Sequence, residues 1–523
     1  MAQSKFKPYV LLWLSTFTIG ALTYGPLYAT SLTNNYDGLW SPALYYAGKW
    51  EISIGRWFWP ILDTLRQGYA ADPFNSLLTL ALIAGGAVML FDCFGFVGKR
   101  RTYLYAALVP VSVTVCSHLS YRYMSPTFGL GLFLSVLAVW LLVKEKSKKF
   151  LSVTKLLSVT TLTLTLGLYQ AFLGVFCVVL LFCFFCRICS YEKLSQSWRF
   201  LLGGSACCAV ACCVYKLLWD AALFFAGITS SDYMGANSVS FDSILSSLPQ
   251  QFIDTYRTFF DYFFDNTIRH NLLQGEILCF VLLGLLFLLP LFCAVSFFAK
   301  KNHAAGLSML VFVLLPPAAC VALLLAPDAG LSVQMTSALS LIVPLSLIFA
   351  DVFLTKQKAE TVKVKQILRF FAPVVAAVVL FGNTYMVGID LEVMSAGRNA
   401  TETLMTSVCQ TLMQEDPTLE NNYVFVGVIS ESPLFAKSPL WNRANTYARY
   451  GQIWSGVGHT CRYSYNGIFR NIGVNLVVSR ESDEFYDSIL HSDKIKQMPV
   501  YPADGSIQKI EEYTVVKISD VLY

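Results

Sequence analysis

Long uninterrupted apolar runs, each close to the length that crosses a bilayer, dominate this sequence. A helix needs about 20 apolar residues to cross the roughly 30 Å hydrocarbon core of a membrane. The 523 residues are 55% hydrophobic and 14% charged, and their mean hydropathy is +0.56, whereas an ordinary soluble domain has about 25% charged residues. The chain is therefore predicted to be a polytopic α-helical membrane protein. The sequence has no long basic stripe outside the membrane flanks, which excludes a nucleic-acid binder.

The apolar runs and their charged borders predict about eleven transmembrane helices. The first run is read as a retained helix, because it is too long for a signal peptide and no small-residue cleavage site follows it. The fifth and sixth runs form one apolar stretch that is broken only at residues 167–170. The predicted spans are residues 9–30, 75–97, 103–119, 127–143, 150–167, 171–187, 200–226, 273–298, 304–325, 332–354 and 367–388.

The distribution of basic residues predicts the orientation. The N-terminal segment and alternate loops are rich in Lys and Arg, as in Lys99-Arg100-Arg101, and the intervening loops have few. Cytoplasmic loops collect basic residues, so the N-terminus is predicted to be cytoplasmic. An odd number of spans then places the chain after about residue 390 outside the cytoplasm.

Two of the predicted outer loops, residues 31–74 and 228–272, are long and rich in aromatic residues. Aromatic rings favour the membrane–water interface. Each loop also has apolar residues at helical spacing, which predicts an interfacial helix in each. These residues are Trp57, Ile61 and Leu65 in the first loop, and Phe252, Tyr256, Phe259 and Phe263 in the second.

The polar character of residues 390–523 predicts a small extracytoplasmic α/β domain after a membrane module of residues 1–389. A helix over residues 390–414 is expected to continue out of the last span. β-branched runs predict strands. The remaining predicted elements are strands at residues 423–429, 473–478 and 513–518, and a helix at residues 483–490.

The first outer loop contains the candidate general base, Asp37. A carboxylate near the bilayer surface is well placed to take a proton from an acceptor hydroxyl. The alternative is a turn or helix cap, since Asp before Gly38 is common in turns.

Three short segments resemble the glucosyltransferase II family of bacterial membrane proteins, the phage-type O-antigen glucosyltransferases and their relatives. The first is Asp37 followed by Ile54-Gly55-Arg56-Trp57, and the second is Leu168-Tyr169-Gln170. The third is Met498-Pro499-Val500-Tyr501-Pro502 with Asp504-Gly505-Ser506-Ile507. Their order and their predicted membrane placement support the resemblance more strongly than any one of them alone.

The resemblance implies a GT-C-type fold with its catalytic carboxylate in the first outer loop. It also implies a lipid-linked donor, an undecaprenyl-phosphate hexose such as glucose, and a polysaccharide or glycolipid acceptor of the cell envelope such as O-antigen. The protein would lie in the bacterial cytoplasmic (inner) membrane, and a donor-lipid synthase and a flippase would be its pathway partners. No cofactor is implied. The sequence leaves a divalent metal open.

Two other function classes stay open at this point. One is a lipid or solute transporter or flippase, although the chain lacks the repeated halves that many transporters show. The other is a non-catalytic scaffold for envelope assembly.

The remaining candidate residues each have a structural alternative. Relatives often have two adjacent acidic residues in the loop, whereas this chain has Tyr36-Asp37; Glu51 is the candidate helper, unless it is a solvated loop glutamate. Arg56, Arg122 and Lys216 are candidates for binding the donor phosphate. The arginines could instead be interfacial anchors, and Lys216 could form a self-neutralised pair with Asp220. Further pocket candidates are Tyr36, Trp40, Tyr169, Gln170 and Asp220.

An aromatic and basic cluster in the predicted outer domain is a candidate for binding the acceptor glycan. Aromatic faces stack on sugar rings, and Arg bonds to hydroxyls. The alternative is that these side chains belong to the core of the domain. The residues are Trp441, Arg443, Tyr447 and Trp454.

Overall fold

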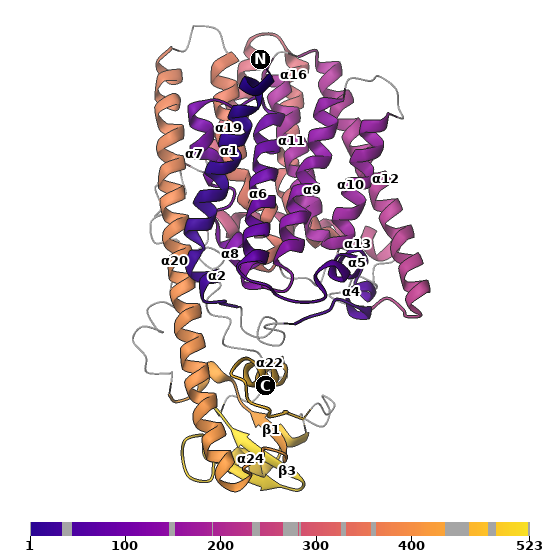
Figure 1. Ribbon diagram of the computed structural model, residues 1–523. Coiled ribbons are helices and arrows are strands. Elements are labelled where there is room, and N and C mark those ends of the chain that lie inside the picture. The colour runs from indigo at the N-terminus through magenta and orange to yellow at the C-terminus, as the bar shows by residue number, and fades with distance from the viewer. Residues whose placement is uncertain are drawn as a thin grey trace.

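A bundle of long helices makes up most of the computed structural model, and a small α/β unit lies beyond one end of it (Figure 1). The N-terminus lies at the opposite end of the bundle. The structure describes residues 2–33, 44–145, 152–190, 192–232, 241–264, 281, 284–325, 331–356, 362–434, 460–479 and 488–520.

The first half of the chain contains both long helices and short ones. Two of them begin after a serine N-cap: Ser112 and Ser152 accept hydrogen bonds from the first turns of the helices that follow them, as N-caps do. The span predicted at residues 103–119 is divided into two helices at this point. The helices are α1 (Ala2–Thr23), α2 (Gly25–Ala29), α4 (Lys49–Ser53), α5 (Phe58–Arg66), α6 (Phe74–Cys93), α7 (Arg100–Ala107), α8 (Val113–Ser120), α9 (Ser125–Lys144), α10 (Val153–Leu168), η1 (Gln170–Phe172), α11 (Leu173–Cys189) and α12 (Leu194–Ala226).

The second half is less regular before its last helices. Within residues 303–325 the helix is divided into short pieces, and Pro316 and Pro317 open the third of them. The elements are α13 (Phe241–Phe264), η3 (Gly284–Leu288), α15 (Leu289–Ala299), α16 (His303–Met309), η4 (Leu310–Leu314), α17 (Leu315–Ala319), α18 (Val321–Leu325), η5 (Val333–Met335), α19 (Ser337–Lys356) and α20 (Val362–Glu415).

All eleven predicted spans contain helix. Within the described residues, five helices have the length and apolar character needed to cross a membrane: Phe74–Cys93, Ser125–Lys144, Gln170–Cys189, Leu194–Ala226 and Phe370–Glu415. Shorter apolar helices occupy Val153–Leu168, Gly284–Ala299, His303–Ala319 and Ser337–Phe353. The helical, membrane-compatible architecture is thus confirmed, and the number of spans remains a prediction.

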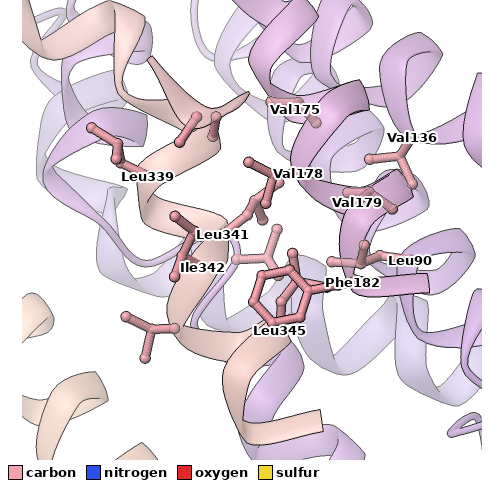
Figure 2. Packing of buried hydrophobic residues seen from close by; sticks show 14 of the residues in the cluster. Leu90, Val136, Val175, Val178, Val179, Phe182, Leu339, Leu341, Ile342 and Leu345 are labelled. Carbon is pink, nitrogen blue, oxygen red and sulfur yellow. The ribbon is translucent and has the colours of Figure 1, made fainter. Parts of the chain in front are cut away.

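The centre of the bundle is α11, which lies among α9, α12 and α19. Figure 2 shows Val178 and Phe182 of α11 on the side that faces Leu341 and Leu345 of α19. By contrast, α12 lies at the edge of the bundle, and its Phe224 and Phe225 are exposed. An apolar helix face with this much exposure is compatible with contact to lipid.

Where a helix is interrupted inside the bundle, side chains form hydrogen bonds with the backbone groups at the break. Between α7 and α8, the Tyr24 hydroxyl donates to the Pro110 carbonyl (2.9 Å) and accepts from the Ser112 amide (3.2 Å). The Asn383 amide of α20 donates to the Val111 carbonyl (2.9 Å). Such partners satisfy the backbone groups that a break leaves open in a low-dielectric interior. The break predicted at residues 167–170 is confirmed, because α10 ends at Leu168 and η1 begins at Gln170.

The two predicted interfacial helices, α5 and α13, differ in whether their apolar stripe is exposed. In α5, Ile61 and Leu65 are exposed, as a surface stripe requires. In α13, Phe259 and Phe263 are buried, and this helix contacts α17 and α18. The aromatic stripe of the second loop therefore packs largely on the bundle, because its rings find apolar partners there.

The C-terminal unit is built around the end of α20. This helix has 54 residues, about 80 Å of length at 1.5 Å per residue, so it extends well past a bilayer core. Its last turns pack on a three-stranded sheet of order β1-β3-β2, in which β1 is parallel and β2 antiparallel to β3. The remaining elements are β1 (Asn422–Val426), η7 (Ile429–Glu431), α22 (Thr460–Asn471), α24 (Asp493–Gln497), β2 (Ile507–Ile510) and β3 (Tyr513–Lys517).

The predicted elements of this unit are found in part. The strand expected at residues 513–518 is β3, and the one at 423–429 is β1. The segment at 473–478 makes only an isolated bridge, Tyr423 to Val478. Much of the helix expected at residues 483–490 lies outside the described residues.

Candidate active site

The bundle end that faces the α/β unit carries α4, α5 and the lower ends of α8 and α13 (Figure 1). Several predicted site residues lie outside the described residues: Tyr36, Asp37, Trp40, Trp441, Arg443, Tyr447 and Trp454. The chain on both sides of residues 34–43 is anchored at this end. The Thr33 hydroxyl donates to the Ser120 carbonyl (3.0 Å), and Leu44 forms an antiparallel bridge with Tyr69.

Glu51 is not a solvated loop glutamate. Its side chain is 2% exposed, and it accepts hydrogen bonds from the Gly48 amide (2.6 Å) and the Tyr45 hydroxyl. Both donors stabilise the first turn of α4, where a carboxylate also interacts favourably with the helix dipole. The carboxylate thus already has two partners at the place where α4 begins.

Asp63 is a second buried carboxylate in this region, which the sequence reasoning missed. It accepts hydrogen bonds from the Ala47 amide (2.9 Å), the Trp59 indole (3.0 Å) and the Arg66 guanidinium (2.6 Å). The sequence signal was its spacing to Arg66 on one helix face. The contacts join α5 to the segment before α4, so Asp63 organises the loop rather than facing a substrate.

Two of the family-like segments meet here although they are far apart in the chain. The Gln170 amide donates to the Ile54 carbonyl (2.8 Å) and to the Tyr215 hydroxyl (2.9 Å). The Tyr215 hydroxyl in turn donates to the Gly55 carbonyl (3.2 Å), and the Trp219 indole donates to the Ile52 carbonyl (2.7 Å). We call Gln170, Tyr215 and Trp219 the clamp. It fixes the backbone that leads into Arg56.

Gly55 is required at this position for two reasons. Its φ of +86° lies in the region that side chains disfavour. A Cβ there would also lie 2.2 Å from the Tyr215 hydroxyl and 2.5 Å from the Gln170 amide nitrogen. The clamp can approach the backbone this closely only because the residue is glycine.

The clamp sets the position of Arg56. Its guanidinium lies over the ring of Tyr169, 4.7 Å from the centroid, in a cation–π contact. Its Nε is buried and has no acceptor among the described residues. The next residue, Trp57, packs on Gly167, where a Cβ would come within 2.7 Å of the indole ring. Arg56 thus combines a fixed position with an unused buried N–H donor.

Arg122 and Lys216, the other two predicted cations, have carboxylate partners. The Arg122 Nε lies 2.6 Å from Asp72, whose side chain is fully buried. The Lys216 Nζ lies 2.5 Å from Asp220 on the same helix, and both side chains are more than half exposed. This favours the self-neutralised alternative for Lys216, whose Nζ also lies over the Trp219 ring, 4.5 Å from its centroid.

An open groove of about 1050 Å³ lies between α4 and the end of α12. Its lining is partly aromatic, with Trp50 and Phe224, and partly polar, with Lys49, Ser230 and Ser231. Both aromatic side chains are exposed. Among the described residues, no group of three or more His, Cys, Asp or Glu side chains is arranged to hold a metal ion.

The third family-like segment lies away from these residues. The Tyr501 hydroxyl is 2.8 Å from that of Ser407 on α20, and its amide donates to the Lys517 carbonyl. Buried Lys517 donates to the Met498 carbonyl (2.8 Å). These contacts attach the segment to the end of α20 and to β3, which is a structural role.

Apolar helices of bilayer-crossing length and a polar, aromatic site at one end of the bundle have the organisation of a membrane enzyme. Comparison with family models identifies the family: residues 30–350 match the glucosyl transferase GtrII model. This match covers more than half of the chain, so the protein belongs to that family and is a glycosyltransferase. The transporter alternative is not supported. Neither curated proteins nor solved structures give a match.

Proposed function

We propose that the protein transfers a hexose, glucose by the family's name, from a polyprenyl-phosphate sugar to a cell-envelope glycan. The reaction would take place at the outer face of the bacterial cytoplasmic membrane, with Asp37 as general base. The observation that carries this proposal is the family match over residues 30–350. That range includes Asp37, Arg56 and the whole clamp.

The proposed chemistry needs one base and one cation. Asp37 takes the proton of the acceptor hydroxyl, and the oxygen attacks the anomeric carbon of the donor sugar. The bond from that carbon to the phosphate oxygen breaks, and polyprenyl phosphate leaves. A single direct displacement inverts the anomeric configuration.

Arg56 is the best-supported cation for the donor phosphate. The leaving phosphate gains negative charge in the transition state, and a fixed guanidinium stabilises that charge. Arg122 is held by Asp72 and Lys216 by Asp220, whereas the buried Nε of Arg56 has no acceptor among the described residues. A phosphate oxygen would supply one.

The groove between α4 and α12 supports a lipid-linked donor. It is an open groove, and Phe224 and Trp50 on its walls offer apolar surface to an isoprenoid chain. Lys49, Ser230 and Ser231 add polar groups to the same lining. The groove lies along α4, and Arg56 follows α4 in the chain, so we place the lipid part of the donor in this groove.

The test is an assay of purified, reconstituted protein with polyprenyl-phosphate glucose and cell-envelope glycan acceptors. The wild type is expected to form glycosylated acceptor, and Asp37→Asn is expected to lower kcat by about a thousandfold or more, the contribution of a general base. NMR of the product should show inverted configuration at the anomeric carbon.

The matched control is Asp493→Asn, which removes a carboxylate whose side chain is 90% exposed on α24. This variant should retain wild-type turnover and folding. Full activity in Asp37→Asn would exclude the base, and a wild type that turns over no polyprenyl-phosphate hexose would exclude the donor class.

A further inference from the structure

We propose that Tyr215 and Gln170 are positioning residues that hold Arg56 for the donor phosphate, a role that rests on the proposed function. Neither side chain needs to touch the substrate. They act through the backbone of Ile54 and Gly55, which leads directly into Arg56.

The first step of the argument is the connectivity of the clamp. Gln170 starts η1, just after α10 ends, while Tyr215 lies in the middle of α12. The Gln170 amide donates to the Ile54 carbonyl and to the Tyr215 hydroxyl, and that hydroxyl donates a hydrogen bond to the Gly55 carbonyl. One hydrogen-bonded chain therefore ties two bundle helices to two consecutive carbonyls of the loop.

The second step is that these hydrogen bonds hold the backbone directly before Arg56. The two carbonyls belong to the bend between α4 and α5, where Gly55 has a positive φ. The Arg56 amide donates to the Glu51 carbonyl (2.8 Å). The backbone of Arg56 is thus held from both sides, which removes the freedom that a loop arginine ordinarily has.

The third step is the side chain itself. Tyr169, the neighbour of Gln170, lies under the Arg56 guanidinium. The same two-residue segment therefore holds the backbone of the bend through Gln170 and the charged group through Tyr169. The Arg56 Nε stays without an acceptor among the described residues. An arginine fixed at both ends with an unused N–H is arranged for an anion that is bound only during turnover.

The experiment is a double-mutant cycle on the full-length reconstituted enzyme with polyprenyl-phosphate glucose as donor. Tyr215→Phe and Gln170→Met each remove the hydrogen bonds and keep the volume. Each is expected to lower kcat/KM for the donor about tenfold, because small misplacements of a charge-stabilising group cost one to two orders of magnitude. In an Arg56→Met background, the same substitutions should change kcat/KM less than about twofold, since interacting residues are non-additive.

The matched control is Thr163→Val, which removes a buried hydrogen bond from α10 to the Ala211 carbonyl of α12 (3.3 Å). It perturbs α12 against α10, the helix that precedes η1, and touches none of the residues that hold the bend before Arg56. It should reduce thermal stability as much as Tyr215→Phe and leave kcat/KM at the wild-type value.

The outcomes separate the two proposals. If Tyr215→Phe and Gln170→Met turn over like the wild type, the positioning role is wrong while the proposed function stands. The same conclusion follows if these substitutions lower kcat/KM for the donor as much in the Arg56→Met background as in the wild type. If the wild type turns over no polyprenyl-phosphate hexose, the proposed function fails, and this role fails with it.

Discussion

Asp72 and Arg122 form a buried ion pair that joins the segment before α6 to the turn between α8 and α9. The Arg122 Nε lies 2.6 Å from Asp72, and the side chains are 11% and 0% exposed. Asp72 also accepts a hydrogen bond from the Ser76 hydroxyl (2.7 Å). The pair therefore holds together two loops at the end of the bundle where the candidate site lies.

Removing one partner of this pair should destabilise the protein. Asp72→Asn leaves a buried guanidinium without its counter-charge, and such changes cost about 3–5 kcal/mol. Thermal unfolding in detergent, followed by intrinsic fluorescence, should show a clearly lower Tm. The control is Arg257→Met, whose ion pair with Asp254 is exposed and should contribute less than about 1 kcal/mol. Equal Tm values for the two variants would contradict a structural role for Asp72.

Glu51 is expected to stabilise α4 rather than to assist catalysis. Glu51→Gln and Tyr45→Phe each weaken the buried contact between these residues, and each should cost about 1–2 kcal/mol. Because both act on one interaction, the double variant should be hardly less stable than either single one. The measurement is the Tm of the three variants together with their kcat.

The kinetics of the same variants separate structure from catalysis. Glu51→Gln and Tyr45→Phe should lower kcat to a similar, small extent. A drop of about a hundredfold or more in Glu51→Gln alone, the size of a general acid–base effect, would instead restore Glu51 as a catalytic helper.

Substitutions of Arg56 and Lys216 should change kcat/KM for the donor to different extents. Arg56→Met removes a guanidinium that nothing else in the described residues replaces, so the donor kcat/KM should fall about a hundredfold or more. Lys216→Met removes one partner of an exposed pair within α12, and the expected change is less than about threefold. A large loss in Lys216→Met would show that the donor phosphate lies on the outer face of α12.

Sequence reasoning located the helices because apolar length is a local property. The break near residue 168 was visible for the same reason, since Gly167 and Gln170 interrupt an apolar run. The short β2 strand, at residues 507–510, was not predicted, because its alternation is weak and it depends on pairing with β3.

The candidate site was predictable only in part. Arg56, Tyr169 and Gln170 were identified from short segments, but their mutual contact depends on a fold that joins residues more than a hundred positions apart. Tyr215 was missed because one hydroxyl inside an apolar span gives no local signal. The partners of Arg122 and Glu51 were missed because hydrogen bonding of a charged group cannot be read from spacing alone.

Arg398 links the last long helix to the chain that leads into the first loop. Its guanidinium donates to the Thr30 carbonyl at the end of α2 and to Glu402 (2.8 Å), which also accepts from Asn471 of α22 (3.3 Å). The α/β unit, α20 and the segment before Asp37 are therefore connected through the Arg398–Glu402 pair. Arg398→Met should leave Tm nearly unchanged, since the ion pair is about one-third exposed.

The same variant should lower kcat/KM for the acceptor roughly three- to tenfold, because a less fixed loop holds the proposed base in reactive geometry less often. Lys496→Met is the control, since its pair with Asp493 lies on the exposed face of α24. Transfer assays at saturating donor and varied acceptor measure the difference. Unchanged acceptor kinetics in Arg398→Met would mean that the loop takes its position from the bundle alone, through Thr33 and Leu44, independently of the α/β unit.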